Sequence, residues 1–203
     1  MKITGIKQQV KRTDRYSVFV DGKYEFSLSD TALLESKLAT GQELSAGQLR
    51  ELKKLSADDK LYNQTLRYMA LRPRSRWEVE FYLERKKTSP ALAKSTLNKL
   101  SIIGLIDDEK FSEAFVNDRR LLRPTSRRKL INELRKKRVA GDIIEKAVGA
   151  GQEEEQTALQ AIIESKRRQA KYRDDDLKLM QYLARQGFNY GDIKEAFQND
   201  ERN

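Results

Sequence analysis

The feature that most limits the fold of this chain is a helical pattern that recurs about every fifty residues. Three leucines each follow a helix-capping residue by eight positions: Leu83, Leu134 and Leu183. They are 51 and 49 residues apart. Each has an apolar residue one helical turn before it, a short break after it, and another apolar residue fourteen positions on. Such a period predicts tandem helical units that bury their apolar faces together.

The recurring pattern predicts three three-helix repeats, at 56–104, 105–150 and 153–203. An ordinary helical bundle with chance similarity is the alternative, but the shared register of cap, leucine pair and break favours the repeat. Asp58 or Asp59 is expected to cap the first helix, which ends at Pro73. Ser75 and Glu78 form a capping box. Further caps are expected at Ser89, Asp107, Ser126 and Asp175.

A β-hairpin is expected before the repeats. Two strand-like segments alternate aromatic or β-branched residues with polar ones, Tyr16–Val20 and Lys23–Leu28. Asp21 and Gly22 lie between them, and this dipeptide favours a type I′ turn because both positions need positive φ. A third strand is expected around Ile3 and Ile6, since an isolated hairpin is marginally stable in water.

The chain is therefore predicted to be mainly α-helical: an elongated array of three tandem three-helix repeats, preceded by a small N-terminal β-hairpin and linking helices. The extension covers residues 1–55. It includes a helix from about Asp30 to Leu38 and a capping box, Ser45 with Gln48, before the next helix.

Composition excludes many enzyme mechanisms. The 203 residues include no Cys and no His. Disulfides, zinc–thiolate sites, cysteine nucleophiles and histidine-based triads are therefore absent. We find no signal peptide and no apolar run of membrane-spanning length, and the lack of Cys fits a reducing compartment. A cytoplasmic protein is expected.

Positive charge is concentrated in the middle of the chain. Residues 61–140 contain 20 basic and 9 acidic residues, a net charge of +11. The flanking segments 1–60 and 141–203 carry +2 and −3. A concentrated field of one sign indicates a polyanionic partner, most simply nucleic acid, and a solubilising helical surface is the alternative.

The candidate site is a basic contact surface. On the helix after Asp107, three arginines lie beside its apolar stripe, and on the next helix the basic residues point away from Leu130 and Leu134. The predicted contact residues are Arg72, Arg74, Arg76, Arg119, Arg120, Arg123, Arg127, Arg128, Lys129, Arg135 and Lys136. Arginine suits phosphate because its planar fork donates two hydrogen bonds. Solvated helix faces are the alternative.

Two aromatic residues lie about opposite the apolar stripe of the helix after Ser75. Trp77 and Phe81 are candidates for surface positions near Arg74 and Arg76. Exposed rings there would suit single-stranded nucleic acid, which stacks its bases on aromatic side chains. Packing against the neighbouring helix is the alternative that we favour. For Arg72 the alternative is a hydrogen bond from its side chain to the last carbonyl oxygens of its own helix.

Acidic residues begin helices in this sequence. Asp107 and Asp108 are interpreted as capping residues, as are the runs 174–176 and 153–155, because carboxylates suit helix N-termini. A Mg²⁺-dependent nuclease using Asp107 and Asp108 is the enzyme alternative, but no further ligand stands at a useful spacing. No phosphate-binding glycine motif occurs, so we predict no enzyme activity, metal or cofactor.

Two motifs resemble the RecX family of bacterial regulatory proteins, which modulate the RecA recombinase. The first is Leu71-Arg-Pro-Arg-Ser75, after a helix rich in aromatic residues. The second is Gly104-Leu-Ile-Asp-Asp108, followed by Phe111. A weaker copy of the first, Leu122-Arg-Pro-Thr-Ser126, stands at the matching place in the second repeat. The resemblance covers about 56–203, and the hairpin is similar to the N-terminal extension of some members.

The resemblance implies a binding regulator made of three tandem three-helix repeats. Such a protein would bind RecA filaments on single-stranded DNA and restrain filament growth and strand exchange. Double-stranded DNA is a second candidate partner. DNA repair, recombination and the SOS response are the implied processes, and a monomer is expected. Trp77 and Phe81 depart from the family pattern, where more polar residues are expected. A free-standing DNA-binding protein, such as a transcriptional regulator, is the alternative.

Overall fold

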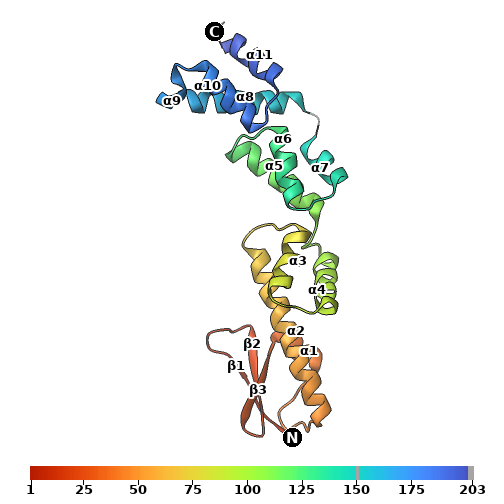
Figure 1. Ribbon diagram of the computed structural model, residues 1–203. Helices are drawn as coiled ribbons and strands as arrows, with labels where there is room; N and C mark the ends of the chain where they lie inside the picture. The colour runs from red at the N-terminus through yellow and green to blue at the C-terminus, as the bar shows by residue number, and fades with distance from the viewer. Residues whose placement is uncertain (150, 201–203) are drawn as a thin grey trace. The chain divides into compact units, whose positions relative to one another are not determined.

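The computed structural model describes residues 1–149 and 151–200 (Figure 1). The chain divides into two compact units. The first consists of Met1–Arg72 and Lys86–Thr96, and the second of Pro73–Arg85 and Leu97–Asn203. No helix in the described part of the chain is both long and apolar enough to cross a membrane. The predicted repeat limits at 150 and 203 lie outside the described residues.

The first unit begins with a three-stranded antiparallel sheet. Strands β1 (Ile3–Gln8), β2 (Arg15–Val20) and β3 (Lys23–Ser29) lie in the order β1-β2-β3. The predicted turn is confirmed, since Asp21 and Gly22 both have positive φ, 48° and 80°. The expected third strand is also confirmed, as β1. The extension therefore contains a three-stranded meander where the sequence most clearly indicated a hairpin.

One face of the sheet carries the core of the first unit. Its buried residues come from all three strands and from the segments that cover them: Ile3, Val18, Val20, Phe26, Leu28, Ala32 and Leu44. Helix α1 (Asp30–Ser36) supplies Ala32 and begins where the Ser29 hydroxyl accepts the Ala32 N–H. Leu49 and Leu52 of helix α2 pack against the same cluster.

Helix α2 (Ala46–Ala70) is continuous over 25 residues, which corrects one prediction. Its capping box, Ser45 with Gln48, is confirmed. Asp58 and Asp59, however, do not cap a new helix, because neither Gly nor Pro occurs between Gln48 and Asp58 to interrupt α2. Instead, Asp59 accepts hydrogen bonds from buried Arg15 at 3.0 Å and from the Ser29 hydroxyl at 2.6 Å. These two hydrogen bonds of Asp59 connect α2 to the sheet beside it (Figure 1).

Helices α3 (Arg76–Arg85) and α4 (Pro90–Ile102) follow. The predicted capping box of α3 is confirmed: the Ser75 N–H donates to Glu78, and the Glu78 N–H donates to the Ser75 hydroxyl. Helix α4 begins with proline after Ser89, whose hydroxyl accepts the Leu92 N–H. Pro73–Arg85 belongs to the second unit, while α4 contributes to both.

A three-helix group follows in the second unit, formed by α5 (Asp108–Leu122), α6 (Arg127–Lys136) and α7 (Gly141–Val148). Asp107 and Ser126 cap α5 and α6, as predicted. The group encloses its own apolar cluster: Phe111, Val116, Leu130, Leu134, Val139, Ile144 and Val148.

The last group contains α8 (Gln152–Arg167), α9 (Ala170–Arg173), α10 (Asp176–Gln186) and α11 (Tyr190–Asp200). Asp175 caps α10 as predicted. The four-residue helix α9 is an addition to the three helices that the sequence indicated. It buries Tyr172, whose ring lies 5.5 Å from that of Tyr182.

The aligned leucines are buried as the repeat pattern requires. Leu83, Leu134 and Leu183 are completely enclosed. The apolar residues fourteen positions later are also buried: Leu97, Val148 and Phe197. The tandem helical fold is therefore confirmed, while the limits of the individual repeats stay a prediction.

Candidate nucleic-acid interface

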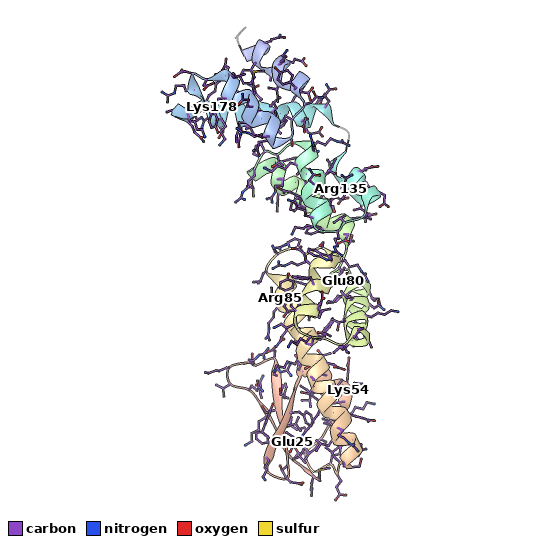
Figure 2. The ribbon with its side chains drawn as sticks, in the orientation of Figure 1. Glu25, Lys54, Glu80, Arg85, Arg135 and Lys178 are labelled. Carbon is purple, nitrogen blue, oxygen red and sulfur yellow. The ribbon has the colours of Figure 1, made fainter. Side chains whose placement is uncertain are left out.

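Helix α6 separates apolar from basic residues. Leu130 and Leu134 lie one turn apart and are buried, whereas Arg128, Arg135 and Lys136 are exposed. This separation follows from the 3.6-residue helical period, which places the basic positions away from the leucine stripe. Figure 2 labels Arg135 among the side chains of this helix.

Two of the predicted contact residues on α5 are held by the protein itself. The Arg119 Nε donates to Glu133 at 2.9 Å, and its guanidinium lies 4.7 Å from the centre of the Phe115 ring. Arg120 donates to the Val148 carbonyl oxygen at 2.8 Å. Their partners come from α6 and α7, so these two arginines connect the helices of this group.

Two basic residues at the start of α6 are held in a similar way. The Arg127 side chain donates to the Gly149 carbonyl oxygen at 2.8 Å. The Lys129 ammonium donates to Gln186 at 2.7 Å. Their charge still contributes to the local field, but their donors are already partly used.

Four predicted residues remain available, and we call Arg123, Arg128, Arg135 and Lys136 the open cations. Each is exposed. None has a side-chain hydrogen bond or ion pair to any residue within 1–149 and 151–200. Their donors can therefore engage phosphate without first breaking an intramolecular contact.

Two open grooves border the basic side of α6. The larger, about 730 Å³, is lined by Arg127, Arg128, Ile131, Asn132, Arg135, Gly151, Gln152, Glu155, Gly187, Asn189 and Asp192. The smaller, about 480 Å³, is lined by Arg128, Lys129, Asn132, Glu133, Lys136, Ala184, Arg185, Gln186 and Gly187. Arg128 and Asn132 line both grooves, so they stand on the ridge between them. The structure thus gathers three open cations along one helix.

Arg123 lies at a third, smaller pocket of about 280 Å³. Other basic residues that line it are Arg119, Lys129 and Lys166, and Tyr182 is its aromatic residue. Lys166 lies 4.9 Å from the centre of the Tyr182 ring. Sequence reasoning missed Lys166, because it belongs to α8, more than forty residues beyond Arg123.

The three arginines around Pro73 differ in exposure and in their partners. Arg72 is exposed and Arg74 is half-buried. Arg76 is ion-paired with Glu80 at 3.0 Å. None of the three lines the grooves beside α6.

The two aromatic candidates pack against each other. The rings of Trp77 and Phe81 are stacked, with centres 5.6 Å apart and planes 20° from parallel. The Arg138 guanidinium lies 5.4 Å from the centre of the Trp77 ring. Phe81 is 46% exposed and Trp77 is half-buried, so Phe81 lies at the surface although packing is the favoured expectation.

Ser75 and Ser126 have a second role that sequence reasoning missed. Besides capping its own helix, the Ser75 hydroxyl donates to the carbonyl oxygen of Lys137, at the end of α6. The Ser126 hydroxyl donates in the same way to Gln186, at the end of α10. The distances are 3.0 and 2.7 Å. Each serine therefore joins the start of one helix to the end of a helix in the following group.

We call each of these serine contacts between two helical groups a joint. The side chain three positions after each serine reinforces it. Glu78 is ion-paired with Lys137 at 2.8 Å. In the equivalent place Lys129 contacts Gln186, as described above. Gly187, with φ of 99°, completes the second joint: a Cβ there would lie 2.9 Å from the Ser126 hydroxyl. The signal that could have revealed the joints is the matching place of the two Pro-X-Ser turns.

Carboxylates also bridge these groups. Asp108 accepts the Arg76 N–H at 2.8 Å, and Glu155 accepts the Arg127 N–H at 2.6 Å. Burial raises the pKa of both carboxyls above their usual values. The pKa of Asp107 is lowered instead, because its carboxylate accepts the Lys110 N–H. Within residues 1–149 and 151–200, no three acidic residues are grouped closely enough to hold a metal ion.

Ser126→Ala tests the joint. Losing a cap alone costs roughly 0.5–2 kcal/mol. Ser126→Ala also removes the donor to the partly buried Gln186 carbonyl, which adds about 1 kcal/mol or more to the loss in unfolding free energy. Ser45→Ala is the matched control, since Ser45 caps α2 at an exposed position. Equal losses for the two variants, measured by urea denaturation, would contradict a joint at Ser126.

Three family models match this chain. The RecX N-terminal domain matches residues 1–45, the first three-helix domain of RecX matches 62–100, and the second matches 107–148. These matches include the sheet, α5, α6 and α7.

Two curated relatives and two solved structures agree with these matches. Regulatory protein RecX of Bacillus subtilis is 30% identical over 98% of this chain and 79% of its own length. That of Lactobacillus johnsonii is 33% identical over 75% of this chain, but the match spans only 56% of the relative. A crystal structure of regulatory protein RecX aligns with a TM-score of 0.73 at 23% identity, over 97% of this chain and 98% of the other, and supports the fold. RecX from Lactobacillus salivarius aligns with a TM-score of 0.60 at 25% identity, over 70% and 95%. By its sequence matches and its fold, the chain belongs to the RecX family of regulatory proteins.

Proposed function

We propose that this protein binds RecA filaments on single-stranded DNA and inhibits the recombinase. The observation that carries the proposal is the set of open cations beside two grooves, in a member of a regulatory family. The role belongs to DNA repair, recombination and the SOS response, in the cytoplasm, and the protein acts as a monomer.

The chemistry of the surface suits a polyanionic partner. Arg128, Arg135 and Lys136 offer donors along one face of α6 that have no partner in the described part of the chain, and Arg123 adds another from the end of α5. Phosphate contacts of this kind position a nucleic acid without reading its sequence. A regulator of a filament needs that property, because the filament forms on DNA of any sequence.

The basic residues whose side chains already bind within the protein, which we call the held cations, have a different role in this proposal. Arg119, Arg120, Arg127 and Lys129 fix the helices that display the open cations. Arg72, Arg74 and Arg76, around Pro73, contact the protein part of the filament. The units that bind are the predicted repeats, 56–104, 105–150 and 153–203.

The experiment is a titration of this protein into the DNA-dependent ATPase reaction of RecA. The expected result is a progressive fall in the ATPase rate as the protein is added. Binding to bare DNA with an unchanged ATPase rate would instead favour a free-standing DNA-binding protein. Nuclease activity on DNA with Mg²⁺ would contradict a purely regulatory role.

A further inference from the structure

The sheet of the first unit has an outer face with two aromatic residues side by side. Phe19 of β2 pairs with Tyr24 of β3 and with Gly5 of β1, so the three share one face. The two rings meet edge to face, with centres 6.2 Å apart. Tyr24 is 57% exposed and Phe19 is half-buried.

These rings are not part of the core. Val18 and Val20, the neighbours of Phe19 along β2, point to the opposite face and are buried in the cluster that α1 and α2 cover. On the outer face, Gly5 leaves space beside Phe19, since a Cβ at Gly5 would meet no atom within 4 Å. The aromatic pair therefore lies at an open surface.

Unpaired positive charge borders the rings. The Lys7 ammonium lies 5.7 Å from the centre of the Phe19 ring. Lys7 follows Gly5 by two positions along β1, so it shares the outer face. Lys7 has no carboxylate partner in the part of the chain that the structure describes, so an anionic ligand would find its charge available.

Two nearby carboxylates are ion-paired with residues of α2. Asp14 is ion-paired with Arg67 of α2 at 2.7 Å. Glu25, next to Tyr24, is ion-paired with Lys53 of the same helix. The outer face therefore combines flat aromatic surface with the positive charge of Lys7.

We propose that this outer face is a stacking platform for single-stranded nucleic acid. A base would stack on Tyr24 beside Phe19, and a flanking phosphate would contact Lys7. A duplex fits poorly, because its bases are already stacked on one another, whereas single strands offer free base faces to aromatic side chains. The inference rests on the proposed function, since it adds a second contact for the same DNA.

The test uses the full-length protein and two labelled strands of equal length, oligothymidine and an abasic deoxyribose–phosphate strand, in fluorescence anisotropy titrations. Tyr24→Ala should weaken binding of oligothymidine by roughly 5-fold to 100-fold. Binding of the abasic strand should not change, because that strand keeps the phosphates but has no base to stack. Tyr24→Phe should bind like the parent protein, since it keeps the ring.

Tyr190→Ala is the matched control. Tyr190 is also 57% exposed, and the Lys194 ammonium lies 5.0 Å from the centre of its ring. It lies on α11, far along the chain from the sheet, and should leave oligothymidine binding unchanged. Melting temperatures equal to that of the parent protein establish that each variant is folded.

Several results would overturn the platform. Equal weakening for both strands would show that Tyr24 does not act by stacking. Unchanged binding of both strands would remove the platform but leave the proposed function intact, provided that the parent protein binds. Loss of RecA inhibition without loss of DNA binding would assign the face to a protein partner. Failure of the parent protein to bind either strand would overturn both proposals.

Discussion

Replacing the four open cations by glutamate should weaken single-stranded DNA binding by roughly 100-fold or more at low salt. The variant changes Arg123, Arg128, Arg135 and Lys136, whose side chains have no hydrogen bond or ion pair among the residues that the structure describes. Each phosphate contact adds about 0.7 to the slope of log K against log[salt] for single strands. The slope should therefore flatten by roughly 2–3 units if all four contact phosphate. Anisotropy titrations at several salt concentrations measure both quantities.

The control reverses four exposed cations elsewhere, so that total charge changes equally. Arg50, Lys54, Lys60 and Lys94 are suitable, since all are exposed and lie outside the grooves beside α6. Lys54 is labelled in Figure 2. This control should retain most of the affinity and most of the salt dependence. If both quadruple variants lose the same affinity, net charge rather than the α6 surface governs binding.

Leu134→Ala should lower the free energy of unfolding by roughly 2–5 kcal/mol, as for other buried leucines. Leu134 is completely buried in the cluster formed by α5, α6 and α7. The loss combines the transfer free energy of the missing methyl groups with the cavity that they leave. Thermal and urea denaturation followed by circular dichroism measure it.

Leu122→Ala is the matched control for the core variant. Leu122 is a leucine of the same helical group but is 77% exposed, at the end of α5. Its truncation should change the unfolding free energy by no more than about 0.5 kcal/mol. A Leu134→Ala protein that melts like Leu122→Ala would show that the aligned leucines are not the core of the fold.

Local signals in the sequence predicted much of the fold. The caps Ser45, Ser75, Asp107, Ser126 and Asp175 all act as expected, because a capping residue acts on an N–H only a few positions away. The aligned leucines are buried because the helical period alone decides which face they occupy.

Long-range contacts could not be predicted in the same way. Arg119 donates a hydrogen bond to Glu133, fourteen positions away on another helix, and Arg127 donates one to the Gly149 carbonyl oxygen. No local pattern in the sequence distinguishes these held residues from Arg128 or Arg135. Asp59 was misassigned for the same reason, since the buried Arg15 that it binds lies in a distant strand.

Inhibition of the RecA ATPase in the presence of excess bare DNA tests the central claim most directly. RecA is kept limiting, single-stranded DNA is raised well above what RecA can cover, and the ATPase rate is measured with and without this protein. A protein that recognises the filament should still inhibit, because its proposed contacts with RecA are absent from bare DNA and make the filament the tighter ligand. Inhibition that disappears as bare DNA is added, or that never occurs, would contradict the proposal that this RecX family member acts on the filament.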